Sequence, residues 1–390
     1  MNVDIEFFSD NPMDNVLSCM KFAFEKVIFF GYTQEDMDRA ATSTVAAFLK
    51  SKNINVEQIA FVALPEGKLE VIEKELGRIV SAEIQAGNNC YIDLTGGEEL
   101  ALAAAGVVSD KYNIPMHEID LAEDEVRIQS CPEAYEQLSK RDYRLSIEEY
   151  LNLHEGVIEW RLQKSKNKKY NDEAHKNRIK ELNHFMESEK KRWNKLSQGL
   201  AFFCSKQEDL ICGGRKKLAG AARVAGMSEP VFIDKLKKMK EQNILRSFIY
   251  EDGIVNLEFY SDEERGILCD PGAILEHITY WQVMEDREVN DCAIGYHVNW
   301  IGDGDPDSIY ELGPDVINEI DIIYMKKNIP TFISCKNNMV YMNQPLYELE
   351  TVADRFGGKL VHKVLVAKGG ISDATARRAK EMDIEVVKHL

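Results

Sequence analysis

The sequence NEIDIIYMKKNIPTFISCKN, residues 318–337, decides the expected fold of the C-terminal part of this 390-residue chain. Glu319 and Asp321 lie two residues apart in an apolar, β-branched run, and a strand with a side-chain period of two places both carboxylates on one face. Residues 325–330 are polar and end in proline, which predicts a turn. Residues 331–336 predict a second short strand, so the stretch is expected to form a β-hairpin.

The second strand carries Ser334 and Lys336, which also share a face because they lie two residues apart. Pairing of the two strands brings the lysine ammonium beside the two carboxylates. Carboxylate oxygens bind a divalent metal ion, and an adjacent cation holds an attacking water, which together are what phosphodiester hydrolysis requires. A surface hairpin with an ordinary Glu–Lys pair is the alternative interpretation.

The flanking segments extend this pattern. Residues 270–272 are typical of the start of a helix. The residues that follow have apolar side chains at helical spacing, and Glu276 lies on a different face from these apolar side chains. Alternation in residues 293–301 predicts a strand before the hairpin. Residues 346–356 predict an amphipathic helix closed by two glycines, and residues 363–367 predict a further strand. The expected order is helix, three strands, helix, strand.

That order, with an acid on the first helix, Asp321 on the second strand and Lys336 on the third, resembles the core of the PD-(D/E)xK nuclease superfamily. The resemblance implies that Asp321 is the central ligand of Mn²⁺ or Mg²⁺. It also implies Glu276 as a second or water-mediated ligand and the backbone carbonyl of Cys335 as a third. Lys336 would orient the attacking water and stabilise charge in the transition state.

Ser334 departs from the superfamily pattern, which usually has Asp, Glu or Gln two residues before the lysine. A serine hydroxyl is a weaker metal ligand than a carboxylate. Glu276 or Glu319 is expected to compensate, so both belong to the candidate catalytic set. Ser334 itself would donate a hydrogen bond to phosphate or simply pack.

The first 150 residues alternate short apolar strands with segments of helical periodicity, which predicts a doubly wound, mainly parallel α/β domain. Strands are expected at residues 5–8, 27–30, 59–64 and 90–94. Ligands bind beyond the carboxyl ends of strands in such sheets, and backbone N–H groups at helix starts favour phosphate. The candidate binding residues in the loops after the first, second and fourth strands are Ser9, Asn11, Met13, Asn15, Thr33, Gln34, Thr95, Gly96, Gly97 and Glu98.

These loops lack the G-x-G-x-x-G fingerprint of dinucleotide-binding folds. However, LTGG at residues 94–97, which leads into a small apolar helix, resembles the signature of CRISPR-associated Rossmann-fold (CARF) sensor domains. SIEEYLNLHEG at residues 146–156 and ISCKN at residues 333–337 resemble the Card/Can-type effectors of type III CRISPR systems, which join this sensor to a PD-(D/E)xK nuclease. A lone TGG is otherwise most often a tight strand-to-helix turn.

The resemblance implies a homodimer whose paired sensor domains bind cyclic oligoadenylate, usually cyclic tetra-adenylate, across the two-fold axis. Binding of this activator would switch on metal-dependent cleavage of single-stranded DNA or RNA, or nicking of supercoiled DNA. A ligand with two-fold symmetry suits an isologous dimer interface. Glu98 and Glu99 stand where many such sensors have threonine and lysine, so these carboxylates are expected to point away or to accept adenine or ribose protons.

Charge is unevenly distributed along this chain of net charge −18. Residues 1–150 carry 28 acidic against 13 basic residues, whereas residues 159–246 carry 11 against 22. The basic zone predicts phosphate contacts, with a solvated lysine-rich face as the alternative. We expect a sensor domain at 1–150, a basic helical linker with a winged-helix-like unit at 151–262, and a nuclease domain at 263–390.

The remaining features of the sequence concern the cellular location of the protein and its alternative functions. No signal peptide and no membrane span are visible, so a cytoplasmic protein without membrane contact is expected. The eight cysteines include no CxxC pair and the eight histidines show no ligand spacing, which indicates reduced thiols and no zinc motif. Two other functions fit the same sequence: a cyclic-oligoadenylate-responsive DNA-binding regulator with a degenerate nuclease fold, and a nucleotide-binding scaffold that recruits partners.

Overall fold

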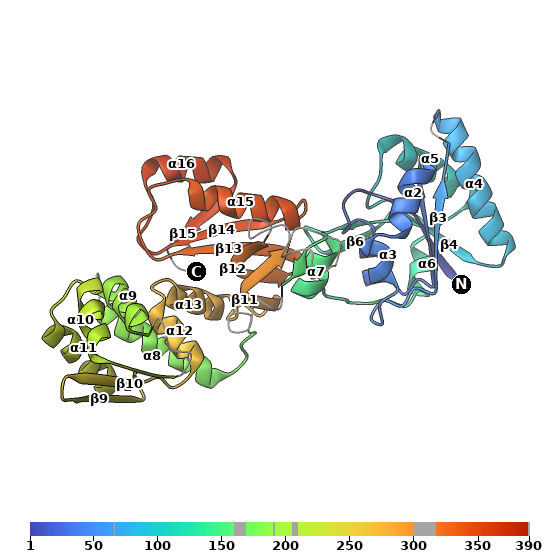
Figure 1. Ribbon diagram of the computed structural model, residues 1–390. Helices are drawn as coiled ribbons and strands as arrows, with labels where there is room; N and C mark the ends of the chain where they lie inside the picture. Colours follow the sequence, from blue (N-terminus) through green and yellow to red (C-terminus); the bar gives the residue numbers. More distant parts are fainter. Residues whose placement is uncertain (66, 160–168, 190–191, 205–209, 300–316, 389–390) are drawn as a thin grey trace.

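The computed structural model describes residues 1–65, 67–159, 169–189, 192–204, 210–299 and 317–388. It is a mixed α/β structure with two six-stranded sheets and one three-stranded sheet. Figure 1 shows the N-terminal sheet in blue, the C-terminal sheet in orange and red, and a central helical unit in yellow-green beside the C-terminal sheet. Within the described residues no helix has the length and apolar character needed to cross a lipid bilayer.

The N-terminal sheet has the order β3-β2-β1-β4-β5-β6, in which β6 alone runs antiparallel to its neighbour. The predicted doubly wound arrangement and its four strands are therefore confirmed, while β5 and β6 lay outside the prediction because polar residues interrupt their apolar runs. The strands are β1 (Asn2–Phe7), β2 (Lys26–Gly31), β3 (Gln58–Ala63), β4 (Asn89–Asp93), β5 (Met116–Asp120) and β6 (Glu125–Ile128). The helices are α1 (Leu17–Lys21), α2 (Gln34–Ala41), α3 (Thr44–Leu49), α4 (Leu69–Gln85), α5 (Glu99–Tyr112) and α6 (Pro132–Glu136).

Helix α7 (Ile147–Leu153) joins the two large sheets. It begins with a capping box, in which Ser146 and Glu149 satisfy each other's backbone N–H groups. Its apolar side chains belong to one continuous buried cluster that also contains Phe29 of the N-terminal sheet and Phe332 of the C-terminal sheet. The chain then supplies β7 (Val157–Ile158), which pairs with an edge of the C-terminal sheet. Helix α7 therefore contacts helix α3 of the N-terminal domain and also packs on the C-terminal sheet.

The C-terminal sheet has the order β15-β14-β13-β12-β11-β7, and the expected order of helix, three strands, helix and strand is confirmed. The strands are β11 (Val289–Asn299), β12 (Ile317–Lys326), β13 (Ile329–Lys336), β14 (His362–Ala367) and β15 (Ile384–Val387). The helices are α13 (Ala273–Val283), α15 (Gln344–Phe356) and α16 (Asp373–Glu381). Residues 300 and 301, expected at the end of the first strand, lie outside the described residues.

The turn of the β12–β13 hairpin is shorter than residues 325–330, so the predicted bounds are wrong. Lys327 and Asn328 alone form it, both with left-handed φ angles of 52° and 62°, as a two-residue hairpin turn requires. Pro330 belongs to β13 instead. It precedes Thr331, the first residue of β13 that pairs with β14, so its missing N–H leaves that ladder intact.

The central unit has its own hydrophobic core, separate from the cores of the two large sheets. Its three-stranded sheet has the order β8-β10-β9, and a turn at Asp252 and Gly253 joins β9 to β10. The strands are β8 (Ile211–Gly213), β9 (Ser247–Glu251) and β10 (Ile254–Glu258). The helices are α8 (Glu173–Glu189), α9 (Trp193–Cys204), α10 (Arg215–Val224), α11 (Glu229–Glu241) and α12 (Asp262–Cys269). Helices followed by a β-hairpin fit the winged-helix-like prediction, which stays a prediction.

Candidate functional site

The β12–β13 hairpin separates at its open end, and Asp321 lies at the point of separation. The recorded pairing runs from Lys326 opposite Ile329 to Ile322 opposite Ile333. Beyond it, the backbone N–H of Cys335 donates to Asp321 Oδ2 at 2.7 Å. The Asp321 carboxylate therefore accepts the Cys335 N–H in place of a backbone carbonyl of β12, and it lies between the two strands.

Two further donors reach the same carboxylate. The Ser334 hydroxyl donates to Asp321 Oδ2 at 3.2 Å, and Lys336 Nζ lies 3.5 Å from that oxygen. The Lys336 and Asp321 side chains are 34% and 19% exposed, so solvent reaches the pair. The structure thus brings together three of the four predicted side chains of the hairpin, Asp321, Ser334 and Lys336, with a cation next to a partly exposed carboxylate.

Glu276 approaches this cluster from α13, which packs on the same sheet. Cys335 Sγ lies 3.8 Å from Thr279 Oγ1, one helical turn beyond Glu276 on the same face. Burial raises the pKa of the Cys335 thiol well above its usual range, and the nearby charges of Asp321 and Glu276 raise that pKa further. Glu319 lies elsewhere on β12, where its carboxylate is 3.9 Å from His297 Nε2.

The donor set suits a hard divalent cation. The three contacts of Asp321 reach Oδ2, so Oδ1 is the oxygen that would hold a metal. Glu276 and the Cys335 carbonyl would supply further oxygen ligands, and oxygen donors are what Mn²⁺ and Mg²⁺ prefer. The residues present therefore fit the metal that the sequence predicts.

The loop after β1 is closed by the buried side chain of Asn15. Its Oδ1 accepts the Ser9 N–H at 2.7 Å, and its Nδ2 donates to the Ser9 carbonyl at 2.7 Å. Asn11 is tied to the same loop because its N–H donates to Ser9 Oγ at 3.2 Å. Parallel strands bring their carboxyl ends to one sheet edge, so Thr33 and Gln34, which open α2 after β2, lie at the same edge.

The loop after β4 is anchored by Asp93. Its Oδ1 accepts both the Thr95 N–H at 2.7 Å and the Thr95 hydroxyl at 2.5 Å, while Thr95 Oγ1 accepts the Ile119 N–H at 2.9 Å. Gly96 packs on the β1 loop so tightly that a Cβ would come within 2.8 Å of Asp14 Cβ. The two loops therefore form one unit. Gly97 has a φ of 140°, and Glu98, at the start of α5, is exposed.

A pocket of about 330 Å³ opens between these loops and the C-terminal sheet. Of the binding residues expected from the sequence, Asn11, Met13 and Thr95 line this pocket. Sequence analysis missed its two cations, Arg127 and Lys359, because they come from β6 and from the segment before β14. Lys359 Nζ lies 3.1 Å from Asp14 Oδ2, and Arg127 lies 2.6 Å from Asp120. Both cations are therefore neutralised by carboxylates of the same pocket, and an anion would have to compete with Asp14 and Asp120 for them.

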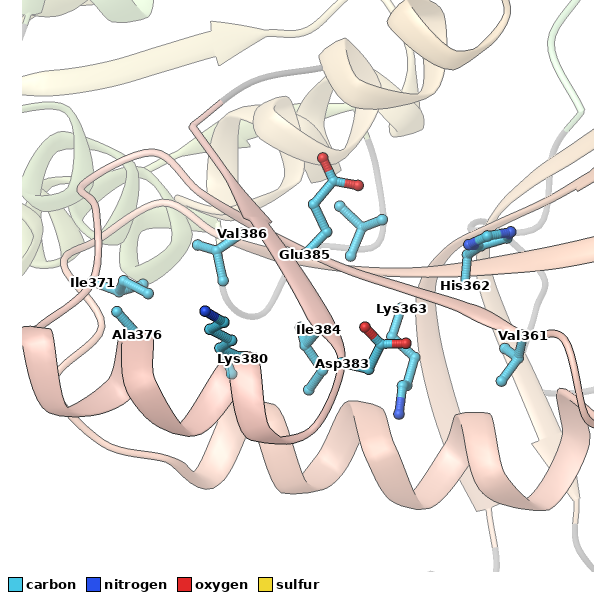
Figure 2. A pocket seen from close by; sticks show the side chains of 12 residues that line it. Val361, His362, Lys363, Ile371, Ala376, Lys380, Asp383, Ile384, Glu385 and Val386 are labelled. Atoms are coloured by element: carbon cyan, nitrogen blue, oxygen red, sulfur yellow. The ribbon is translucent and has the colours of Figure 1, made fainter.

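A second cavity, of about 410 Å³, lies between α16 and the β14–β15 strands (Figure 2). Its lining includes His362 and Lys363 at the start of β14. Lys336 pairs with Ala367 at the opposite end of that strand. The cavity therefore lies away from Asp321 and Lys336, and none of the predicted site residues lines it.

Comparison with known proteins defines the fold class. No protein-family model matches the chain, and no curated protein matches it. Protein VC1899 from Vibrio cholerae is similar over 99% of this chain and 93% of its own, with a TM-score of 0.70 and 18% identity. Can2 from Sulfobacillus thermosulfidooxidans, solved in complex with cyclic tetra-adenylate, is similar over 100% of this chain and 96% of its own, with a TM-score of 0.65 and 14% identity. The chain therefore has the fold of these two proteins over essentially its full length.

Proposed function

We propose that this chain is a cyclic-oligoadenylate-activated, metal-dependent endonuclease of type III CRISPR defence. In this proposal residues 1–150 are a CARF sensor and residues 263–390 a PD-(D/E)xK nuclease domain. The observation that carries it is the Asp321 carboxylate, held between separated strands beside Lys336, with Glu276 on the adjacent helix α13. Similarity in fold to Can2, which was solved with cyclic tetra-adenylate, supports the same assignment.

The proposed chemistry is hydrolysis of a phosphodiester bond. Mn²⁺ or Mg²⁺, when bound, supplies a Lewis acid and lowers the pKa of a water ligand. Asp321, Glu276 and the Cys335 carbonyl hold that ion. Lys336 holds positive charge beside the position where the phosphate becomes more negative, and the Ser334 hydroxyl and Cys335 N–H fix the orientation of the Asp321 carboxylate.

The proposed activator, cyclic tetra-adenylate, binds at the carboxyl edge of the N-terminal sheet in a homodimer. The loops there carry backbone N–H groups and stand next to Arg127 and Lys359, which suits an anionic ring. Glu98 and Glu99 are exposed at the start of α5, and in this proposal they point away from the phosphates or accept adenine or ribose protons.

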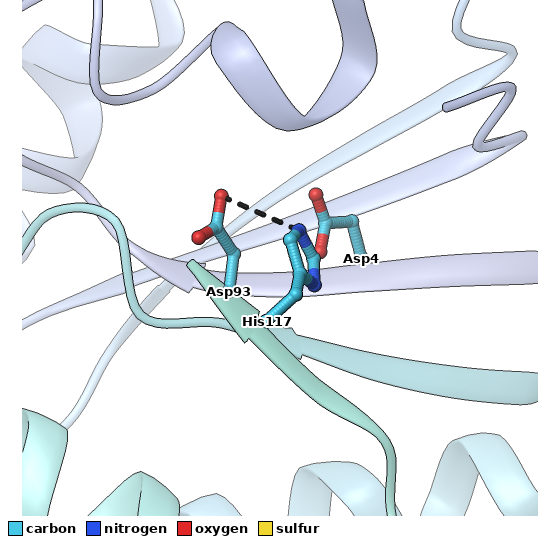
Figure 3. Close-up of side chains that lie close together, drawn as sticks. All are labelled: Asp4, Asp93 and His117. Atoms are coloured by element: carbon cyan, nitrogen blue, oxygen red, sulfur yellow. Dashed lines mark ion pairs between the residues drawn. The ribbon is translucent and has the colours of Figure 1, made fainter. Parts of the chain in front are cut away.

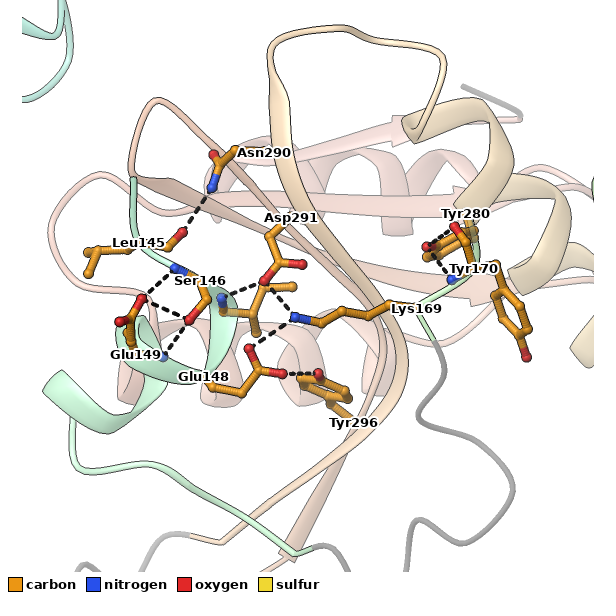
Figure 4. A network of polar contacts seen from close by, with 11 residues as sticks. Leu145, Ser146, Glu148, Glu149, Lys169, Tyr170, Tyr280, Asn290, Asp291 and Tyr296 are labelled. Atoms are coloured by element: carbon orange, nitrogen blue, oxygen red, sulfur yellow. Dashed lines mark hydrogen bonds and ion pairs between the residues drawn. The ribbon is translucent and has the colours of Figure 1, made fainter. Parts of the chain in front are cut away.

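Coupling between the two domains runs through α7 and its contacts with the hairpin sheet. The Leu145 N–H donates to Asn328 Oδ1 in the hairpin turn at 2.8 Å. The Ile147 N–H donates to Asp291 Oδ2 at 2.9 Å, and Lys169 lies between Asp291 and Glu148 (Figure 4). Ile329 and Pro330, next to that turn, line the pocket below the sensor loops. A ligand in the sensor can therefore shift the strands that carry Asp321 and Lys336, which is what allosteric activation requires.

The test is cleavage of labelled single-stranded DNA, single-stranded RNA and supercoiled plasmid, with Mn²⁺ or Mg²⁺, with and without cyclic tetra-adenylate. We expect cutting only when both metal and activator are present. Absence of cutting in every combination would contradict the enzyme assignment. An activator-independent nuclease would contradict the sensor assignment alone.

A second candidate is a cyclic-oligoadenylate-responsive DNA-binding regulator. The helices and hairpin of the central unit favour it, as does Ser334 in place of a carboxylate. The lysines of α11 favour it less, since Lys235 is paired with Glu189 at 2.7 Å and Lys238 with Asp234 at 3.2 Å. Tight binding of duplex DNA without cleavage would support this alternative.

A further inference from the structure

A second set of metal-ligand side chains lies inside the N-terminal sheet, apart from the candidate nuclease centre. Asp4 on β1, Asp93 on β4 and His117 on β5 face one another there (Figure 3). Asp93 and His117 are direct neighbours in the pairing of β4 with β5. One ligand atom from each of the three lies within 4.8 Å of the others. The three residues are 0%, 2% and 0% exposed, so the cluster is sealed from solvent.

In the part of the chain that the structure describes, most carboxylate oxygens of this cluster lack hydrogen-bond partners, although Asp93 Oδ1 accepts from Thr95. Within the described residues, three oxygens make no hydrogen bond: both carboxylate oxygens of Asp4 and Oδ2 of Asp93. In the same part of the chain, no lysine or arginine is ion-paired with them, and the nearest basic atom is His117 Nε2, 3.9 Å from Asp93 Oδ2. Burial raises the pKa of the Asp4 carboxyl well above its usual range, and the Asp93 charge raises it further. Such a site is unfavourable unless a proton or a cation compensates the charge.

His117 is arranged as a metal ligand would be. Its Nδ1 lies 2.9 Å from the Tyr135 hydroxyl, so a tautomer with the proton on Nδ1 donates to that oxygen. In that tautomer Nε2 accepts the Ser18 hydroxyl proton at 2.8 Å, and an ion bound to Nε2 on the side of Asp93 would replace this hydrogen bond. Burial lowers the pKa of His117, although the Asp93 charge opposes this, which keeps the imidazole neutral as ligation requires. A hydrogen bond to the distal nitrogen is the usual way that proteins orient a metal-bound histidine.

We propose that Asp4, Asp93 and His117 bind a structural divalent transition-metal ion, Zn²⁺, in the core of the N-terminal domain. One ion neutralises two carboxylates and gives the unpartnered oxygens a ligand at the same time. A nitrogen ligand with two oxygens suits Zn²⁺, whereas Ca²⁺ and Mg²⁺ prefer larger all-oxygen sets. A tetrahedral site needs a fourth ligand, and the Ser18 hydroxyl, 2.8 Å from His117 Nε2, lies beside the three side chains. Because the other oxygen of Asp93 holds Thr95, the ion would also fix the binding loop. This site is independent of the proposed nuclease activity.

The experiment uses the full-length chain with the Asp321→Ala substitution, which removes the central ligand of the candidate nuclease metal. The chain is loaded with Zn²⁺ alone, freed of excess metal, and analysed by elemental mass spectrometry. We expect about one zinc per chain. Addition of Asp4→Asn or His117→Gln is expected to lower zinc affinity at least about 10-fold, measured by competition with a chelating dye.

Glu6→Gln is the matched control. Glu6 lies two residues from Asp4 on the same strand and is 3% exposed, but it is not one of the three proposed ligands. The Glu6→Gln chain is expected to keep its zinc. Circular dichroism shows whether each variant is folded, and anomalous scattering at the zinc edge from crystals of the unsubstituted chain needs no variant at all. Zinc-loaded crystals without a peak between the three side chains, or equal zinc affinity in all variants, would overturn the proposal.

Discussion

The two large sheets each hold carboxylates on their strands, but in opposite environments. Asp321 of the C-terminal sheet receives an N–H, a hydroxyl and an ammonium group, and its side chain remains 19% exposed. Asp4 of the N-terminal sheet is fully buried, and neither of its oxygens has a hydrogen-bond partner within the described residues. A group that meets an exchanging substrate needs access and an orienting set of donors. A group that holds a resident ion can be sealed, because the ion itself supplies the missing partner.

The largest expected effect tests the accessible carboxylate. Asp321→Ala or Lys336→Ala is expected to lower activated cleavage at least about 10²-fold, since each removes a group that stabilises the transition state or holds the metal. Affinity for cyclic tetra-adenylate, measured by calorimetry, is expected to stay unchanged. Lys326→Ala is the matched control, because Lys326 lies on the same hairpin, is paired with Asp286 and Glu288, and is remote from Asp321. A variant of Asp321 or Lys336 that cuts at the parent rate refutes the assignment.

The next prediction concerns a buried carboxylate that, unlike Asp4, has charged partners. Asp124 is also well buried, 11% exposed, but it lies between Lys21 at 2.5 Å and Arg144 at 2.7 Å. Burial raises the pKa of this carboxyl, but hydrogen bonds from Lys21 and Arg144 outweigh that effect, and the net pKa is lowered. Asp124→Asn, which tolerates the left-handed φ of 59° at this position, is expected to cost about 2 kcal/mol of unfolding free energy at pH 7 because it leaves Lys21 buried without its counter-charge.

The sign of its pH dependence follows from the lowered pKa. The stabilisation by Asp124 is complete above the unfolded pKa of about 3.9 and is lost as the pH falls through the lower folded pKa. Denaturant unfolding of the parent and Asp124→Asn chains at a series of pH values measures this. The two stabilities are expected to converge in acid. A constant difference down to the lowest accessible pH would show that the ion pairs contribute nothing.

The sequence predicted more of the fold than of the sites. Local patterns sufficed for β1 to β4 of the N-terminal sheet, for α13 and for the hairpin that carries Asp321 and Lys336, because each pattern lies within one or two elements. They could not predict that the hairpin strands separate so that Cys335 donates to Asp321, since this depends on packing of the whole sheet. The Asp4, Asp93 and His117 cluster escaped a search for ligand spacings because three separate strands contribute it.

A smaller effect tests the link between the sealed cluster and the binding loop. Thr95→Val removes the hydroxyl that donates to Asp93 and accepts the Ile119 N–H. Loss of such a hydrogen bond costs about 1–1.5 kcal/mol, so the activator concentration for half-maximal cleavage is expected to rise about 10-fold. Asn15→Ala removes the side chain that bonds to the Ser9 backbone in the loop after β1, and it is also expected to raise the activator concentration for half-maximal cleavage. Without activator, both variants should remain as inactive as the parent.

Thr42→Val is the control for the Thr95 substitution, because the exposed Thr42 hydroxyl donates only to a carbonyl within its own turn. Dose-response curves for cyclic tetra-adenylate compare the three variants. Unaltered curves for both Thr95→Val and Asn15→Ala would mean that the activator binds elsewhere, and the buried cluster would then lose its proposed connection to signalling.

The smallest effect concerns the junction, which is the contact between helix α7 and the C-terminal sheet. There the partly exposed carboxylates of Glu148 and Asp291 share the ammonium group of Lys169. Lys169 lies 2.7 Å from Asp291 and 3.0 Å from Glu148, with its own side chain 39% exposed. Burial lowers the pKa of Lys169, but hydrogen bonds to Asp291 and Glu148 outweigh it, so the net pKa is raised. Its stabilisation is therefore complete below the unfolded pKa of about 10.4 and is lost as the pH rises through the folded value.

Lys169→Met keeps the aliphatic stem and removes this charge, and at pH 7 it is expected to cost about 1 kcal/mol of unfolding free energy, because solvent screens a pair of this exposure. The melting temperature should fall by about 2 °C. As the pH rises through the raised folded pKa of Lys169, the difference in melting temperature between parent and variant should disappear. Equal melting temperatures already at pH 7 would mean that partnered charges at the junction, unlike those around Asp124, do not stabilise the contact, and coupling of the sheets would then rest on the apolar face of α7 alone.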